Sequence, residues 1–235
     1  MARKIKVPNE HLKRFAREEN KRKVNTRNKR KYFLIVCEGE KTEPNYFEGL
    51  KEDLPKGVLT NCKIDIEGTG YNTQSLIDEA LRLKKIYEKE NNRPIDRLWV
   101  VFDKDSFSAE EFNSAVMRCQ NSKPEIGCAW SNEAFELWYL LHFHFYNHEM
   151  SRRDYQDKIE ENLKPLIDIN YVYKKNSLEM YTILKKYGNI NNAIRNAKKL
   201  EEHFKGRQDY ANHNPCTMVY RLIEELQELQ ELQSE

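Results

Sequence analysis

Three acidic side chains stand directly after two short, strongly apolar segments of the sequence. Glu38 follows YFLIVC at 32–37, and Asp103 and Asp105 follow LWVVF at 98–102. Residues two apart in an extended chain project to the same side, so we expect Asp103 and Asp105 to face one cavity. Carboxylates that close together repel each other unless a cation lies between them, and hard cations such as Mg²⁺ prefer carboxylate oxygens. The pattern therefore predicts a site for Mg²⁺ (or Mn²⁺) formed by Glu38, Asp103 and Asp105.

The elements around these acids indicate how they are positioned. The two apolar segments are typical of buried strands in a parallel sheet. A lone Asp-x-Asp is more often a turn or a helix cap, but functional groups of such sheets gather at the carboxyl ends of the strands, which favours the metal site. The sequence also predicts strands at 62–67 and 126–130, and helices at 42–50, 75–91, 108–122 and 133–143. This alternation predicts an α/β fold with a mostly parallel sheet flanked by helices.

The pattern changes after Phe143. It becomes helical, with helices predicted at 151–166, 177–187, 191–204 and 216–232, which together form a helical C-terminal extension. The last helix has leucines at heptad-like spacing, which suits docking onto the chain's own body or onto a partner. We divide the chain into a basic flexible arm at 1–31, an α/β domain at 32–145 and a helical region at 146–235 packed on it.

Charge distribution and cysteine content bear on the protein's partners and on its cellular compartment. Residues 1–31 hold thirteen Lys and Arg against three Glu, although the whole chain has a net charge of only +2. Such an arm either contacts nucleic-acid phosphates or is a solvated leader. The five cysteines include no CxxC pair, which argues against a zinc site or a disulfide framework and indicates a reducing compartment. Because no apolar run reaches membrane length, we expect a cytoplasmic protein without membrane contact.

Longer motifs resemble known families. An apolar strand followed by Glu-Gly, paired with an apolar strand followed by Asp-x-Asp, resembles the Toprim domain. The strings CEGEKTEPNYF, SNEAFELWYLLHF and NPCTMVYRLIEEL resemble the RloB-like family, to which the abortive-infection AbiL second component is similar. The resemblance extends from about Tyr32 to Leu226, which is nearly the whole chain except the basic arm.

The resemblance implies a Toprim-like fold and a metal-dependent nuclease that hydrolyses phosphodiesters of DNA or RNA, tRNA included. It implies a role in a prokaryotic anti-phage or abortive-infection system, with an ABC- or AAA-type ATPase encoded nearby as partner; a homo-oligomer is left open. The Toprim glutamate would be Glu38, and the Asp-x-Asp would be Asp103 and Asp105. Related nucleases carry a further acid after the glutamate. The candidates for it are Glu40 and Glu43, and we favour Glu43.

Two more side chains are candidate catalytic residues. Glu136 lies among apolar residues of a predicted helix, where a carboxylate needs a partner or a metal, unless it lies on the helix's wet edge. Lys175 would stabilise negative charge on a reacting phosphate, or would be one of a solvated lysine pair. We interpret Ser131 and Asn132 as the N-cap of the helix that carries Glu136, and Arg152 as part of a solvated helix face.

Two other functions would use the same features. A primase-like nucleotidyl transferase would use the same acids, although the sequence has no evident triphosphate-binding loop. A non-catalytic Toprim scaffold, or a nucleic-acid-binding subunit of an ATPase complex, would use the sheet only as a framework. The product distinguishes them, since strands would be cleaved, extended or left unchanged.

Overall fold

The computed structural model describes residues 31–70, 73–105 and 107–231, and its described residues from Lys31 onward form one compact unit. The predicted basic arm lies outside the described residues, apart from Lys31. No helix in the described part of the chain combines the length and the apolar character that a membrane crossing requires.

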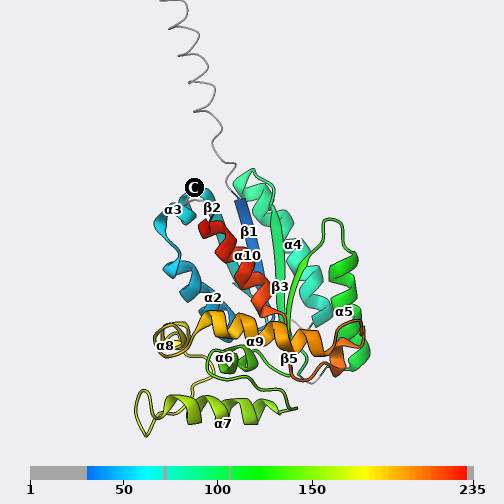
Figure 1. Ribbon diagram of the computed structural model, residues 1–235. Helices are drawn as coiled ribbons and strands as arrows, with labels where there is room; N and C mark the ends of the chain where they lie inside the picture. The colour runs from blue at the N-terminus through cyan, green and yellow to red at the C-terminus, as the bar shows by residue number, and fades with distance from the viewer. Residues whose placement is uncertain (1–30, 71–72, 106, 232–235) are drawn as a thin grey trace, which may run out of the picture. The chain divides into compact units, whose positions relative to one another are not determined.

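A five-stranded sheet lies at the centre of this unit (Figure 1). Its order is β2-β1-β3-β4-β5, with the first four strands parallel and β5 antiparallel to β4. The strands are β1 (Lys31–Cys37), β2 (Cys62–Gly68), β3 (Arg97–Asp103), β4 (Gly127–Asn132) and β5 (Cys216–Thr217). The predicted mostly parallel sheet is therefore confirmed, and each of its four predicted strands is present.

Burial explains why the apolar segments form the inner strands. Every residue of β1 after Lys31 is fully buried, and β3 from Leu98 to Asp103 is buried as well. Strands covered on both faces must be apolar throughout, because parallel sheets carry helices on both sides.

Helices cover both faces of the sheet (Figure 1). One face carries α4 (Thr73–Asn91) and α5 (Ala109–Asn121), which contact each other, and the other carries α2 (Thr42–Asp53) and α10 (Val219–Glu231). A short helix, α3 (Lys56–Asn61), precedes β2. The predicted helix at 108–122 is confirmed as α5, and it begins with a capping box in which Ser108 and Glu111 exchange side-chain and backbone hydrogen bonds.

The remaining helices lie beyond the carboxyl ends of the parallel strands (Figure 1). They are α6 (Glu136–Leu141), α7 (Arg152–Leu163), α8 (Met180–Tyr187), α9 (Ile190–His203) and a short 3₁₀ turn, η1 (Tyr210–Asn212). The predicted helical C-terminal extension is confirmed, since α7, α8, α9, η1 and α10 all follow residue 146, with strand β5 added to them.

Two local predictions were wrong, and both concern the end of β4. Ser131 and Asn132 do not cap a helix but belong to β4, and α6 begins at Glu136 without a side-chain cap. Cys216 and Thr217 do not begin the last helix but form β5. The hydroxyls of Ser131 and Thr217 lie 2.9 Å apart. Pairing between β4 and β5 thus determines the conformation of these residues, in place of the helix starts that the local sequence predicts.

The apolar face of α10 is used within the chain. Leu222, Leu226 and Leu229 are at most 6% exposed, as is Met218 just before the helix. Of the two alternatives left by the sequence, the structure therefore shows docking onto the chain's own body.

Candidate active site

The topology places a crevice where the acids stand. The chain leaves β1 toward β2 on one side and later returns to β3 on the other, so the carboxyl ends of β1 and β3 form a switch point, where ligands of open α/β sheets bind. The backbone N–H of Glu38 donates to Val101 O (2.9 Å), and Glu38 Oε2 accepts from the N–H of Asp103 (3.1 Å). Adjacent strands thus position the first two predicted acids directly beside each other.

A cavity of about 370 Å³ opens at this point. Five of the six predicted site residues line it, namely Glu38, Glu43, Asp103, Asp105 and Lys175. The described lining contains five carboxyl groups and three cationic side chains, so acids are in excess. The residues that line it are Glu38, Gly39, Glu40, Lys41, Thr42, Glu43, Asp103, Asp105, Arg152, Lys175 and Asn176.

Asp103 and Asp105 meet in this cavity by a different geometry from the one predicted. β3 ends at Asp103, and Asp105 lies in a turn with φ +33°, where its N–H donates to Glu133 O (3.1 Å). The extended-chain argument therefore fails, because the chain leaves the strand between the two acids. Their side chains also differ in exposure, at 9% for Asp103 and 44% for Asp105.

Arg152 connects the two aspartates, and its position was not predicted. One terminal guanidinium nitrogen, Nη2, lies 3.2 Å from Asp103 Oδ2, and the other, Nη1, lies 2.9 Å from Asp105 Oδ2. The interpretation of Arg152 as part of a solvated face was wrong, since only 29% of its side chain is exposed. Local sequence gives little signal for this contact, because the residues are almost fifty positions apart and an arginine at a helix start is usually solvated.

Burial leaves the acids poorly neutralised. Loss of solvent raises the pKa of Glu38 to about 7, with a smaller contribution from the nearby charge of Glu43. Loss of solvent, followed by the charges of Glu43 and Glu136, holds the pKa of Asp103 well above its usual range. Two buried carboxylate oxygens, Asp103 Oδ1 and Glu43 Oε2, have no hydrogen-bond partner. Such oxygens are costly to bury, so the cluster favours an added positive charge or protons.

The two candidates for the auxiliary acid occupy different places. Glu43 is only 6% exposed and belongs to the buried face of α2, whereas Glu40 is exposed at the cavity mouth. Gly39 makes room for the inner acid, because a Cβ at that position would collide with Glu43 Oε2. Glu43 is therefore the acid directed into the cluster.

Glu136 and Lys175 complete the surroundings of the cavity. Glu136 lies under it, 1% exposed, and Oε1 accepts from the hydroxyl of Tyr173 at 3.3 Å, so it does not lie on a wet helix edge. Lys175 is exposed at the rim, in a segment held by the hydroxyl of Thr42, which donates to Lys175 O at 3.0 Å.

The donor chemistry of the cluster fits a hard divalent cation, because its ligand atoms are all carboxylate oxygens and two of them lack partners. The side chains are arranged around Arg152, however, and within residues 31–70, 73–105 and 107–231 no three acidic, His or Cys side chains converge as a ligand set. The carboxylate oxygens are of the type that such a cation prefers, while the guanidinium of Arg152 lies between Asp103 and Asp105.

Comparison with known proteins gives one finding. No curated protein and no solved structure matches the chain. The family model described as RloB-like protein matches residues 33–226, which include most of β1, all of β3, the residues that line the cavity and most of α10. On that match over most of its length, the chain belongs to the RloB-like protein family.

Proposed function

We propose that this chain is a metal-dependent nuclease that hydrolyses phosphodiester bonds of DNA or RNA. The observation that supports this most is the buried, under-neutralised acid cluster at the β1–β3 switch point, with partnerless oxygens on Asp103 and Glu43. A cluster used only for folding would gain from full neutralisation, whereas a cluster that binds a cation and a phosphate must leave acceptor oxygens available.

In this proposal Glu38, Asp103 and Asp105 hold Mg²⁺ or Mn²⁺. The bound cation would supply charge neutralisation at the scissile phosphate and a more acidic water. Glu38 is held in place by the N–H of Asp103, so its carboxylate is already oriented. Glu43, whose pKa is raised first by burial, is suited to taking up a proton inside the cavity. Lys175, exposed at the rim, would attract the polynucleotide backbone.

The setting is part of the same proposal. The basic arm at 1–31 would add sequence-independent contacts to phosphates. The protein would act in the cytoplasm, in an anti-phage or abortive-infection system with an ATPase partner, as the resemblance of its motifs implies. Because the leucines of α10 are buried in the chain itself, such a partner would dock on another surface.

The test is a cleavage assay of the full chain, with and without the neighbouring ATPase, on DNA and on total tRNA in the presence of Mg²⁺ or Mn²⁺. Asp103→Asn and Glu38→Gln should each reduce cleavage by at least about 100-fold, since lesser changes around metal sites already cost 10–100-fold. Asp78→Asn is the matched control, because its carboxylate is 69% exposed on α4, pairs with Arg118 of α5 and does not line the cavity.

The outcomes separate the alternatives. Metal-dependent cleavage that Asp103→Asn abolishes and Asp78→Asn retains supports the proposal. Extended strands would indicate a nucleotidyl transferase. Equal cleavage by Asp103→Asn and the unmodified chain, or no change to any substrate in any combination, would overturn the assignment.

A further inference from the structure

Arg152 is placed where helix electrostatics do not favour a cation. It is the first residue of α7, directly after Ser151, which caps the helix in a capping box with Asp154. The amino terminus of a helix carries a partial positive charge and stabilises anions, so an arginine there is unfavourable for the helix itself. Its position is better explained by the acids of the cavity that it lines.

The contacts of Arg152 with those acids are incomplete. Each terminal nitrogen reaches a different carboxylate, at 3.2 Å for Asp103 and 2.9 Å for Asp105, so neither pair is the two-bond fork that makes arginine–carboxylate contacts strong. The Nε of Arg152 is buried without a partner, as is Asp103 Oδ1. Arg152 and Asp103 thus each keep a polar atom without a partner. A better-matched cation can therefore replace Arg152 at the aspartate, and a better-matched anion can replace the aspartate at Arg152.

The position of the helix is fixed while the guanidinium can move. Tyr155, Ile159 and Leu163 are fully buried and hold α7 against the body, and the hydroxyl of Tyr155 donates to Asn132 O at 3.2 Å. Beyond its Cα, Arg152 has a long flexible side chain with a planar fork of donors, which matches two oxygens of a phosphate group. It can therefore exchange partners within the cavity without movement of the backbone.

We propose that Arg152 is the resident counter-ion of the acid cluster, that a divalent cation displaces it from Asp103 and Asp105, and that its released guanidinium then binds a phosphate of the nucleic-acid backbone. This inference rests on the proposed function, because it uses the same acids as cation ligands. It makes cation and nucleic acid bind cooperatively. The coupling is reciprocal, so each ligand strengthens the other's binding by the same factor.

The first measurement is calorimetric titration of the full chain with Mn²⁺ alone. Arg152→Gln should bind Mn²⁺ about tenfold more tightly than the unmodified chain, because the competing charge-assisted hydrogen bonds are gone. Arg152→Lys keeps the charge but loses the fork, so its Mn²⁺ affinity should lie between those of Arg152→Gln and the unmodified chain. It serves as the test variant if Arg152→Gln does not fold. Arg153→Gln is the matched control on the same helix, since Arg153 is exposed, and it should bind Mn²⁺ like the unmodified chain.

The second measurement is binding of short DNA and RNA oligonucleotides with and without Ca²⁺, a cation with the same preference for oxygen ligands. A gel run afterwards checks that the strands remain intact. Ca²⁺ should strengthen oligonucleotide binding to the unmodified chain and to Arg153→Gln, and this strengthening should fall about tenfold or more in Arg152→Gln.

Each outcome bears on a different claim. Equal Mn²⁺ affinity of Arg152→Gln and the unmodified chain would overturn the counter-ion role. Tighter Mn²⁺ binding with undiminished coupling to the oligonucleotide would overturn the phosphate role. If neither the unmodified chain nor Arg152→Gln binds Mn²⁺, the proposed function itself fails, and the inference fails with it.

Discussion

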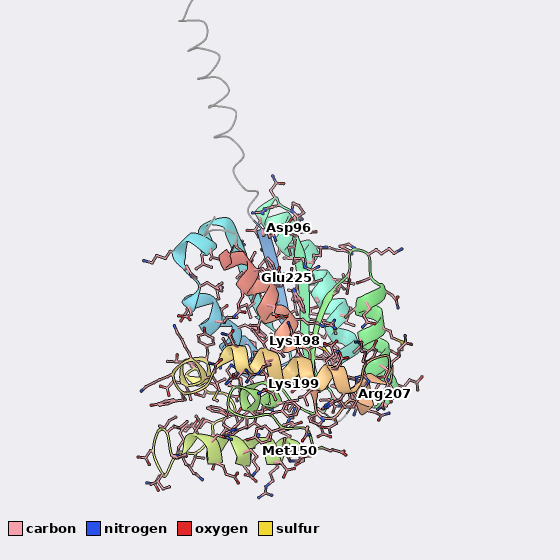
Figure 2. All side chains as sticks on the ribbon, viewed as in Figure 1. Asp96, Met150, Lys198, Lys199, Arg207 and Glu225 are labelled. Atoms are coloured by element: carbon pink, nitrogen blue, oxygen red, sulfur yellow. The ribbon has the colours of Figure 1, made fainter. Side chains whose placement is uncertain are left out.

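The two ends of β3 carry acids in contrasting surroundings. At its amino end, Glu225 of α10 accepts from Arg97 Nε (2.5 Å) and Nη2 (2.8 Å) and from Trp99 Nε1 (3.0 Å). At its carboxyl end, Asp103 has one oxygen on Arg152 and the other without a partner. Figure 2 shows Glu225 toward one end of the sheet and Met150, two residues before Arg152, toward the other.

The difference separates a structural ion pair from a site. Around Glu225 every acceptor has a matched donor, and the hydrogen bonds of Glu225 raise the pKa of Arg97. Around Asp103, burial and neighbouring acids raise the pKa of the carboxyl, and donors are too few. Changes at the amino end should therefore alter stability alone, while changes at the carboxyl end should alter stability and ligand binding in opposite directions.

The largest effect on stability is expected at Leu226, next to Glu225 on α10. Leu226 is 2% exposed, and truncating a buried leucine to alanine costs about 2–5 kcal/mol through lost contacts and the cavity left behind. Chemical denaturation of Leu226→Ala should show this loss. Mn²⁺ affinity, measured by calorimetry where the variant is folded, should not change. A changed affinity would mean that the two ends of β3 are not independent.

Asp103→Asn should change stability in the opposite direction. We expect it to stabilise the metal-free protein by about 1–3 kcal/mol, the range for relieving an unsatisfied buried polar group. The amide removes a charge that Glu43 and Glu136 oppose, and its oxygen can still accept from Arg152. Denaturation in the presence of a chelator measures the gain. A loss of stability would show that the ion pair with Arg152 outweighs the repulsion among the acids.

The pH dependence of stability should arise from the carboxyl end. Glu38 has its pKa raised from 4.5 to about 7 by burial, and the pKa values of Glu43 and Asp103 are raised as well. The folded state therefore binds more protons than the unfolded state between about pH 4.5 and 7. The metal-free protein should lose stability as pH rises through this window, by about 1.4 kcal/mol per pH unit for each extra proton held. Melting temperatures across the window test this. Asp103→Asn should flatten the slope, and a slope that rises with pH would contradict the assigned shifts.

Much of the fold could be predicted because its signals are local. The parallel strands are continuous apolar segments, and the start of α5 has a capping box within four residues. β5 gave no such signal, since two residues carry no periodicity and its partner in β4 lies more than eighty positions away. A strand this short is determined by tertiary pairing, which local patterns do not contain.

The site also contains some residues that local sequence signals locate and one that they do not. Glu38 and Asp103 could be located because each stands where a buried strand ends, and parallel strands bring such ends together. Glu43 could have been separated from Glu40 by helical spacing, since Tyr46, Phe47 and Leu50 share its buried face on α2. Arg152 could not be located from the sequence, because its contact with Asp103 depends on how α7 packs beyond the sheet.

The smallest effect is expected at Glu225. Glu225→Gln keeps one amide oxygen as an acceptor but loses the charge that pairs with Arg97. The two side chains are 21% and 37% exposed, so solvent screens the pair and the loss should be about 1 kcal/mol. Glu228→Gln is a matched control on the same helix, because Glu228 is exposed, and its stability should stay close to that of the unmodified chain. The slope between pH 4.5 and 7 is assigned to Glu38, Glu43 and Asp103 at the other end of β3, so Glu225→Gln should lower the whole stability profile without changing its slope. A changed slope, or lost Mn²⁺ binding, would mean that the amino end of β3 also acts on the acids at the other end.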